Sequence, residues 1–219
     1  MGQGGFIFVE WDSIQKQYPD FQRAFAELEA RTAQKCTTDW FPKKTVQQAY
    51  GYLTPLSGEQ FGRTSILPAL FDPNPATYGG GQFGATAAVA GFAVPPAYWR
   101  QQFTTTGHQI LIQGCRSGET LPEDFKVAWA GIAFPNKNQQ ISEIKWQIGD
   151  RKYGRVNIEE MHSYNKPAII FEEGFVLNEE SSFELYGYVE QADYQRIVLL
   201  GAAFYKIIDK VLGTPGSVI

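Results

Sequence analysis

The sequence predicts a mainly β protein: an antiparallel β-sandwich of about eight strands, jelly-roll-like, with one N-terminal amphipathic helix and a long irregular arm. Two observations support this. Short segments that alternate apolar and polar residues follow one another from residue 103 to 208, separated by turn residues. Long helices do not alternate with these segments, which disfavours a doubly wound α/β fold.

Length and composition limit the number of domains and the kinds of partner that the chain can have. The chain has 219 residues, of which 43% are hydrophobic and 15% aromatic, and this fits one large β domain or two small ones. The formal net charge of −4 argues against a nucleic-acid groove spread over the whole surface. The 22 glycines and 12 prolines suit a chain with many turns.

Targeting signals are weak. Residues 1–10 have neither a basic start nor an adequate apolar core, so we expect no signal peptide. The longest apolar run, residues 83–96, falls short of the roughly 20 residues that a membrane helix needs. The two cysteines, Cys36 and Cys115, are expected to be free thiols rather than a bridge, which favours a reducing compartment. We therefore expect a soluble chain without a transmembrane segment.

The N-terminal region begins with a short strand predicted over Phe6 to Trp11. A helix is predicted from Pro19 to Lys35, because proline suits the first helical turn. Phe21, Phe25 and Leu28 are spaced four and three residues apart, so they form one apolar face of that helix.

The following segments are harder to interpret. Residues 45–53 fit a strand or a short helix. Residues 54–84 predict an irregular arm, because Pro-rich and Gly-rich turns interrupt them. The arm is nevertheless too apolar for a disordered linker, so we expect it to lie on its own domain or on a neighbouring chain. Its apolar residues are Phe61, Ile66, Leu67, Leu70, Phe71, Tyr78 and Phe83.

The C-terminal half is predicted to be strand after strand. Ile141 to Ile148 alternates most regularly, and Gly149-Asp150 after it indicates a tight hairpin. The predicted strands up to this hairpin and just beyond it cover His108 to Cys115, Asp124 to Phe134, Ile141 to Ile148 and Arg151 to Glu159. In the first of them, Ile110 and Ile112 are expected on the face opposite Leu111.

Three more strands are predicted between Pro167 and Ile208. Phe183, Leu185, Gly187 and Val189 are expected on one face of the second strand, with Glu184, Tyr186 and Tyr188 on the other. The run Ile197 to Tyr205 is apolar on both faces, which indicates a strand covered on both sides. The whole chain then divides into residues 1–102 (strand, helix and arm), 103–212 (sandwich core) and 213–219 (tail), within one structural domain.

The usual catalytic patterns are weak in this sequence. A cupin-type metal site needs two or three histidines on neighbouring strands, and the chain has two in all, His108 and His162. Met161-His162-Ser163 places a base beside a hydroxyl, but sequence neighbours on an extended chain point to opposite faces. We assign no catalytic, cofactor-binding or metal residue, and we expect a protein that is not an enzyme.

Adjacent glutamates recur at Glu159-Glu160, Glu172-Glu173 and Glu179-Glu180. Solvated strand ends are the simplest interpretation. A glycosidase carboxylate pair and a calcium site stay open as alternatives. The calcium ligands would come from Glu172, Glu173, Glu179 or Asp193.

Aromatic residues exceed what one sandwich core needs. They either cover the sandwich of their own chain or are buried against neighbouring subunits, because interfaces favour Tyr, Trp and Phe. The expected interface residues are Tyr78, Phe83, Trp99, Phe103, Tyr186 and Tyr188.

A chain with long arms and no recognisable active site is typical of an assembly subunit. We therefore expect a structural subunit of a self-assembling particle, a virion protein of the capsid, vertex or tail. Its partners would be copies of itself and other particle proteins. A carbohydrate- or ligand-binding sandwich is the alternative, and a cupin-like or glycosidase-like enzyme comes third. Fold alone does not decide among them.

Overall fold

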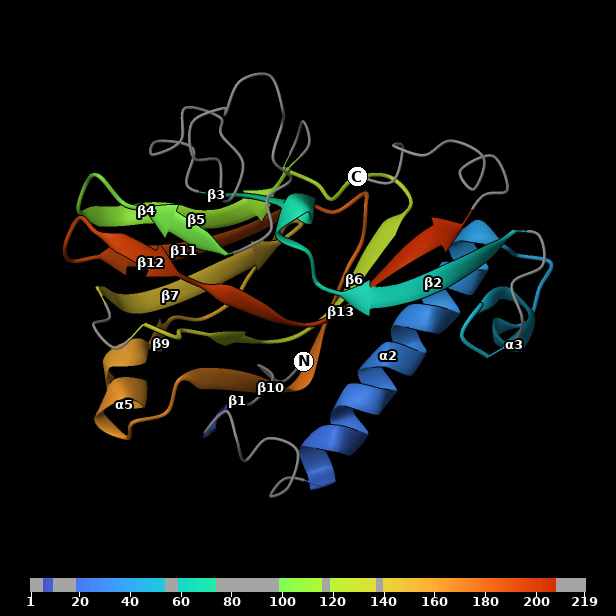
Figure 1. The fold of residues 1–219 in the computed structure, drawn as a ribbon, viewed down its shortest axis with the longest axis horizontal. Coiled ribbons are helices and arrows are strands. Elements are labelled where there is room, and N and C mark those ends of the chain that lie inside the picture. Colours follow the sequence, from blue (N-terminus) through green and yellow to red (C-terminus); the bar gives the residue numbers. More distant parts are fainter. Residues whose placement is uncertain are drawn as a thin grey trace, which may run out of the picture.

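The computed structural model describes residues 6–9, 19–53, 59–73, 99–115, 119–136 and 140–207. Within these ranges the chain is mainly β, with antiparallel strand pairs and three α-helices (Figure 1). We call the two larger sheets A and B. Sheet A has the strand order β1 (Phe6–Val9), β10 (Ala168–Leu177), β6 (Phe125–Ala133), β13 (Val198–Ile207) and β2 (Gln60–Ser65).

Sheet B has the strand order β3 (Phe71–Pro73), β5 (Gly107–Gly114), β11 (Phe183–Val189), β7 (Ile141–Ile148) and β8 (Arg151–Lys152). A further short strand, β9 (Val156–Asn157), also pairs with β7. Two more, β4 (Arg100–Gln102) and β12 (Tyr194–Arg196), pair with each other. In the described residues from 99 to 207, strand therefore follows strand with one short helix among them, largely as the alternation predicts.

The strand pairs nest inside one another. β2 pairs with β13, β5 with β11, β6 with β10, and β7 with β8. The innermost pair closes through Gly149 and Asp150, where Gly149 has a φ of 56°, a conformation that suits glycine. Successive pairs belong alternately to sheet A and sheet B, so one long antiparallel ribbon winds through both sheets.

One hydrophobic core fills the space between the sheets. The Trp129 ring, from sheet A, meets the rings of Trp146 and Phe183 from sheet B edge to face, with centroids 5.6 and 5.1 Å apart. The Trp129 indole N–H donates a hydrogen bond of 2.7 Å to the carbonyl oxygen of Gly131. This packing confirms a mainly β, antiparallel, sandwich-like fold.

Alternation predicts sheet B well, with one exception. The four residues of β11 from Phe183 to Val189 that were expected inward are buried. In β5, however, Leu111 and Ile112 are both buried, although they were predicted on opposite faces. The register with β11 shifts between Leu185 and Tyr186, so a bulge turns two consecutive side chains inward.

The predicted arm is partly regular structure. Residues 60–73 form β2, a 3₁₀ turn (η2, Pro68–Leu70) and β3. Phe61, Leu70 and Phe71 are buried in the core of their own chain, so this part of the arm is buried without a neighbouring chain. Sequence alternation misses these strands because they are short and interrupted by glycine or proline. Residues 45–53, left open above, contain α3 (Val46–Ala49), which Thr45 and Gln48 cap reciprocally.

Helix α2 (Pro19–Trp40) lies on the outer face of sheet A (Figure 1). It continues past Lys35 because the residues that follow keep its buried stripe and no proline occurs before Pro42. The stripe consists of Leu28, Thr32, Ala33, Cys36 and Thr37. The helix α5 (Ile158–Ser163) replaces the end of the strand predicted over Arg151 to Glu159, and it buries Ile158 and Met161 at the edge of the inter-sheet core.

Candidate functional site

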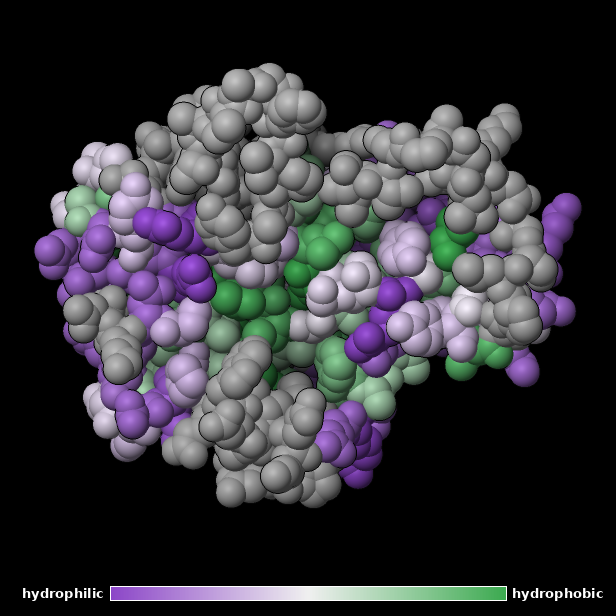
Figure 2. All heavy atoms as spheres, viewed as in Figure 1, coloured by the Kyte–Doolittle hydropathy of each residue, from purple (hydrophilic) through white to green (hydrophobic). Residues whose placement is uncertain are grey.

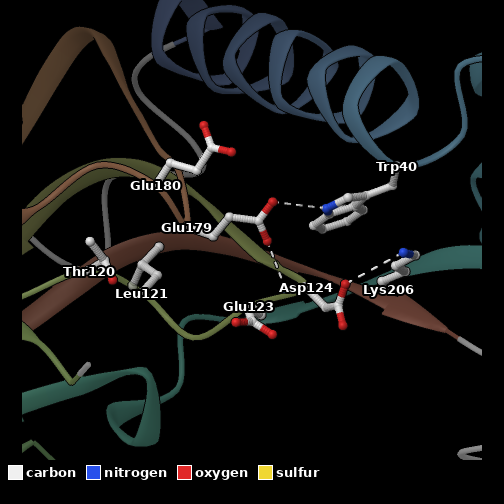
Figure 3. A pocket seen from close by; sticks show the side chains of 8 residues that line it. All are labelled: Trp40, Thr120, Leu121, Glu123, Asp124, Glu179, Glu180 and Lys206. Atoms are coloured by element: carbon white, nitrogen blue, oxygen red, sulfur yellow. Dashed lines mark hydrogen bonds and ion pairs between the residues drawn. The ribbon is translucent and has the colours of Figure 1, made fainter. Parts of the chain in front are cut away.

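A cleft of about 680 Å³ opens where the C-terminal end of α2 meets the ends of sheet A (Figure 3). Helix α2 contributes Trp40, the segment before β6 contributes the next four residues, the turn after β10 contributes two glutamates, and β13 contributes a lysine. The lining residues are Trp40, Thr120, Leu121, Glu123, Asp124, Glu179, Glu180 and Lys206. Carboxylates outnumber cations here, so the cleft is acidic.

Glu179 is the central side chain of this cleft (Figure 3). Its Oε2 accepts a hydrogen bond of 2.7 Å from the backbone N–H of Asp124. Its Oε1 accepts one of 3.2 Å from the Trp40 indole N–H and lies 3.3 Å from Nζ of Lys126. A single carboxylate therefore joins α2, the start of β6 and the turn after β10.

Lys126 is the buried cation beneath Glu179. The residue is 1% exposed and extends from β6 toward the helix side of sheet A. Its Nζ lies 3.0 Å from Oδ2 of Asp39 and 5.1 Å from the centre of the Trp40 ring. A buried ammonium group is tolerated only when it is paired, and here two carboxylates and an indole face surround it.

A second recess of about 480 Å³ lies on the other side of Glu179. It is lined by Lys35, Asp39, Lys126, Asn178, Glu179, Glu180 and Ser181. Across the ranges that the structure describes, no three His, Cys, Asp or Glu side chains are arranged to hold a metal ion, so the calcium alternative gains no support. Nearby, burial raises the pKa of the Cys36 thiol to about 12.

The sequence indicated one member of this site, since Glu179 is among the possible calcium ligands named above, but it did not indicate Lys126. The available signal was a lysine within a strand whose other residues are all apolar. Such a lysine requires buried counter-charges, but the sequence does not say that Asp39 and Glu179 supply them.

The six residues predicted at an interface have different environments. Tyr78 and Phe83 lie outside the described residues. Trp99 and Phe103 are 8% and 1% exposed and belong to the inter-sheet core, where Trp99 packs on Phe71. The surface of these two side chains is thus buried within the chain, and they present little of it to a neighbour.

Tyr186 and Tyr188 are on the outer face of sheet B. Tyr188 is 39% exposed and meets the His108 ring edge to face. The Tyr186 hydroxyl donates a hydrogen bond to the Glu184 carboxylate, and Lys145 lies over its ring. Burial and that hydrogen bond together raise the pKa of Tyr186. These two of the predicted residues remain available for contact.

The surface also carries a groove of about 360 Å³ beside the start of β13. It is lined by Ser65, Ile66, Leu67, Pro68, Trp99, Val198, Leu199, Leu200 and Gly201. Figure 2 shows hydrophobic side chains gathered near the middle of the molecule, with polar ones dominating the end that carries β4, β5 and β12.

Neither a protein-family model, nor a curated protein, nor a solved structure matches this chain. No helix in the described ranges combines the length and apolarity needed to cross a bilayer.

Proposed function

We propose that the chain is a jelly-roll structural subunit of a self-assembling particle, a virion component of the capsid, vertex or tail. The nested strand pairs support the jelly-roll assignment, because each successive pair crosses to the other sheet. Viral capsid domains are among the proteins built this way, together with lectins and cupins. The proposal includes no enzymatic activity.

One observation disfavours the cupin-like class. The space between the sheets, where a cupin-like protein would hold its ligand, is filled by interlocking rings. Trp129 and Trp146 both pack on Phe171, with ring centroids 4.8 and 5.0 Å away, and Phe175 closes the group. A filled interior favours a protein that acts through its surface.

The first test is solution mass by light scattering after size exclusion, over a range of concentrations. We expect species well above the 24.5 kDa of one chain, increasing with concentration. A mass that stays at one chain at every concentration, also after mixing with the other proteins of the source particle, would contradict the proposal.

The residues proposed to contact neighbouring subunits lie on the outer face of sheet B. We expect Tyr186→Ala and Tyr188→Ala to lower the assembled fraction while the unfolding midpoint of the monomer changes little, because Tyr188 is well exposed. Tyr164→Ala, at the exposed end of α5, is the matched control and should leave assembly unchanged. If both sheet B variants unfold the monomer instead, these tyrosines stabilise the fold and do not form an interface.

A carbohydrate-binding role is the second candidate, and the cleft at the end of α2 favours it. There the Trp40 indole lines the same cleft as the carboxylates of Glu123, Asp124 and Glu180 (Figure 3). An aromatic ring with a few polar groups in a cleft is a common ligand site. A glycan array followed by titration of tryptophan fluorescence tests it. A binder whose affinity Glu180→Gln weakens would support this role, and an array without binders would remove it.

A further inference from the structure

The outer face of sheet B carries polar and aromatic side chains in rows that run across the strands, because directly paired residues point to the same side of a sheet. In the strand order β3, β5, β11, β7 and β8, the first row is Asp72, Gln113, Glu184, Gln147 and Lys152. Over the three long strands β5, β11 and β7, the second row is Ile110, Tyr186 and Lys145, and the third is His108, Tyr188 and Glu143. The described helices pack on other parts of the chain, α2 and α3 against sheet A and α5 against the inter-sheet core.

The two ends of the first row carry opposite charges. Neither Asp72 nor Lys152 has an ion-pair partner within the described residues. Burial raises the pKa of the Asp72 carboxyl group, as expected for an acid without a counter-charge. Four strand spacings of about 4.8 Å separate β3 from β8, so the two charges lie roughly 19 Å apart. This distance exceeds the screening length of about 8 Å at physiological salt, so the two groups do not neutralise each other within one chain.

A two-fold rotation about the middle strand would bring these charges together. Strand β11 is the third of the five strands, so an axis that runs along it, above the face, carries β3 onto β8 of a second copy. Each row stays over the same row. Asp72 then faces Lys152 of the second copy, and this pair occurs twice because of the symmetry. In the third row, His108 likewise faces Glu143 of the second copy.

The other axis in the plane of the face, across the strands through the second row, fits the charges less well. It would place each strand over the same strand of the second copy, so Asp72 and Lys152 would not meet. Lys145 would face Lys145 of the second copy, and like charges oppose association. The axis along β11 has one like-charge contact, Glu184 with itself, against two kinds of opposite pair. Charge complementarity therefore favours the axis along β11.

We propose that two copies of this chain pair face to face through the outer faces of their B sheets, about a two-fold axis along β11. This pairing rests on the proposed function, because it names one contact from which the particle would be built. Tyr186 and Tyr188 lie on the axis and face their equivalents in the second copy. From strand spacing and length, the face covers roughly 500 Å² per copy. A total of about 1,000 Å² is at the lower limit of specific interfaces, so the pair should dissociate on dilution.

Exchange of the edge charges tests the pairing. Sedimentation of the full chain over a range of concentrations gives the dimer dissociation constant. We expect Lys152→Asp and Asp72→Lys each to weaken the dimer at least about tenfold, because each places like charges opposite each other at two symmetric positions. The double variant, Asp72→Lys with Lys152→Asp, restores both pairs and should return the constant to within about threefold of the wild type.

Arg151→Asp is the matched control. It makes the same change of charge at the neighbouring residue of β8, whose side chain points to the other side of the strand, so the dimer should change little. Thermal melts at low concentration check that each variant folds. Lys152 is exposed, so Lys152→Asp suffices if Asp72→Lys does not fold. Equal effects of Lys152→Asp and Arg151→Asp, or a double variant as weak as the single ones, would overturn the pairing.

The position of the axis has its own test, in the full chain with Cys115→Ser. A short bis-maleimide should join two copies through Tyr188→Cys, because this residue faces itself. It should join few copies through Lys145→Cys, which faces Ile110 of the second copy. Glu184→Gln should tighten the dimer about threefold, because it removes a like-charge contact on the axis. Linkage through Lys145→Cys and not through Tyr188→Cys would overturn the axis along β11.

Failure of the pairing and failure of the proposed function give different results. Oligomers that form equally well in all of these variants would overturn the pairing and leave the particle proposal in place. Dimers that respond to the charge exchange but never grow would support the pairing and contradict the particle. A chain that stays monomeric by itself would overturn the pairing, whereas its assembly with other particle proteins would still support the function.

Discussion

The two hydrophobic layers of this protein are built from different side chains. Between the sheets, large rings such as Trp129 and Trp146 interlock. Between sheet A and α2, alanines such as Ala128 pack beside the rings of Phe61 and Phe204, and ion pairs such as Lys126–Asp39 add charge to the contact. The difference teaches that ring packing dominates between the sheets, whereas the helix layer combines small residues and rings with paired charge.

Strand β6 serves both layers. All but the first of its residues are buried, with Val127 and Trp129 in the inter-sheet core and Ala128 and Ala130 under the helix. Neighbouring positions of one strand therefore report on different layers. Gly174 makes a similar adjustment in β10, since its φ is 64° and an added Cβ would lie 2.5 Å from Leu28 of α2.

The largest effect is expected from Trp129→Ala. This variant removes the ring that contacts four other aromatic side chains between the sheets. We expect a loss of about 3–5 kcal/mol in the free energy of unfolding, measured by urea denaturation followed by circular dichroism. A loss below about 1 kcal/mol would mean that the inter-sheet core tolerates the cavity, and the contrast between the layers would fail.

A smaller effect is expected from Ala128→Leu, in the helix layer. The extra volume has no room under α2, so we expect a loss of about 1–3 kcal/mol in the free energy of unfolding, measured by urea denaturation. Ala26→Leu, on the exposed face of α2, is the matched control and should leave that free energy unchanged. Equal effects of the two variants would show that Ala128 does not set the distance between helix and sheet.

The same contrast explains what the sequence could predict. Alternation identified β7 and the faces of β11, because one face is buried and one is solvated. The continuous apolar run from Ile197 to Tyr205 indicated a strand covered on both sides, and β13 does contribute to both layers. The candidate site was not predictable in this way, because the pairing of Lys126 with Asp39 and Glu179 joins residues distant in sequence.

Local irregularity caused the other errors. Leu111 was placed on the wrong face because a bulge breaks the period of two, and no residue type in β5 indicates that bulge. Phe61 and Phe71 were placed in an arm because their strands are short and contain a glycine or a proline. Hydrophobicity alone did indicate that these two residues are buried, but not against which surface.

The smallest effect is expected on the outer face of sheet B, where neither layer is involved. A hydrogen bond to the Glu184 side chain raises the pKa of Glu119, with burial as the second cause. Because the folded state favours protonated Glu119, its contribution to stability is complete in acid and is lost as the pH rises through the raised pKa.

Glu119→Gln tests this assignment, and its effect on the free energy of unfolding is expected to be smaller than those of the variants in the two layers. The glutamine amide donates to Glu184 at every pH, so the variant should match the wild type in acid and exceed it in stability near neutral pH. We expect a difference of about a few tenths of a kcal/mol, because Glu119 is largely in contact with solvent. Thermal melts from acid to neutral pH, with Glu172→Gln as an exposed control, measure it. A difference that does not vary with pH would show that the two carboxyl groups do not share a proton, and that the outer face of sheet B is stabilised independently of their charge.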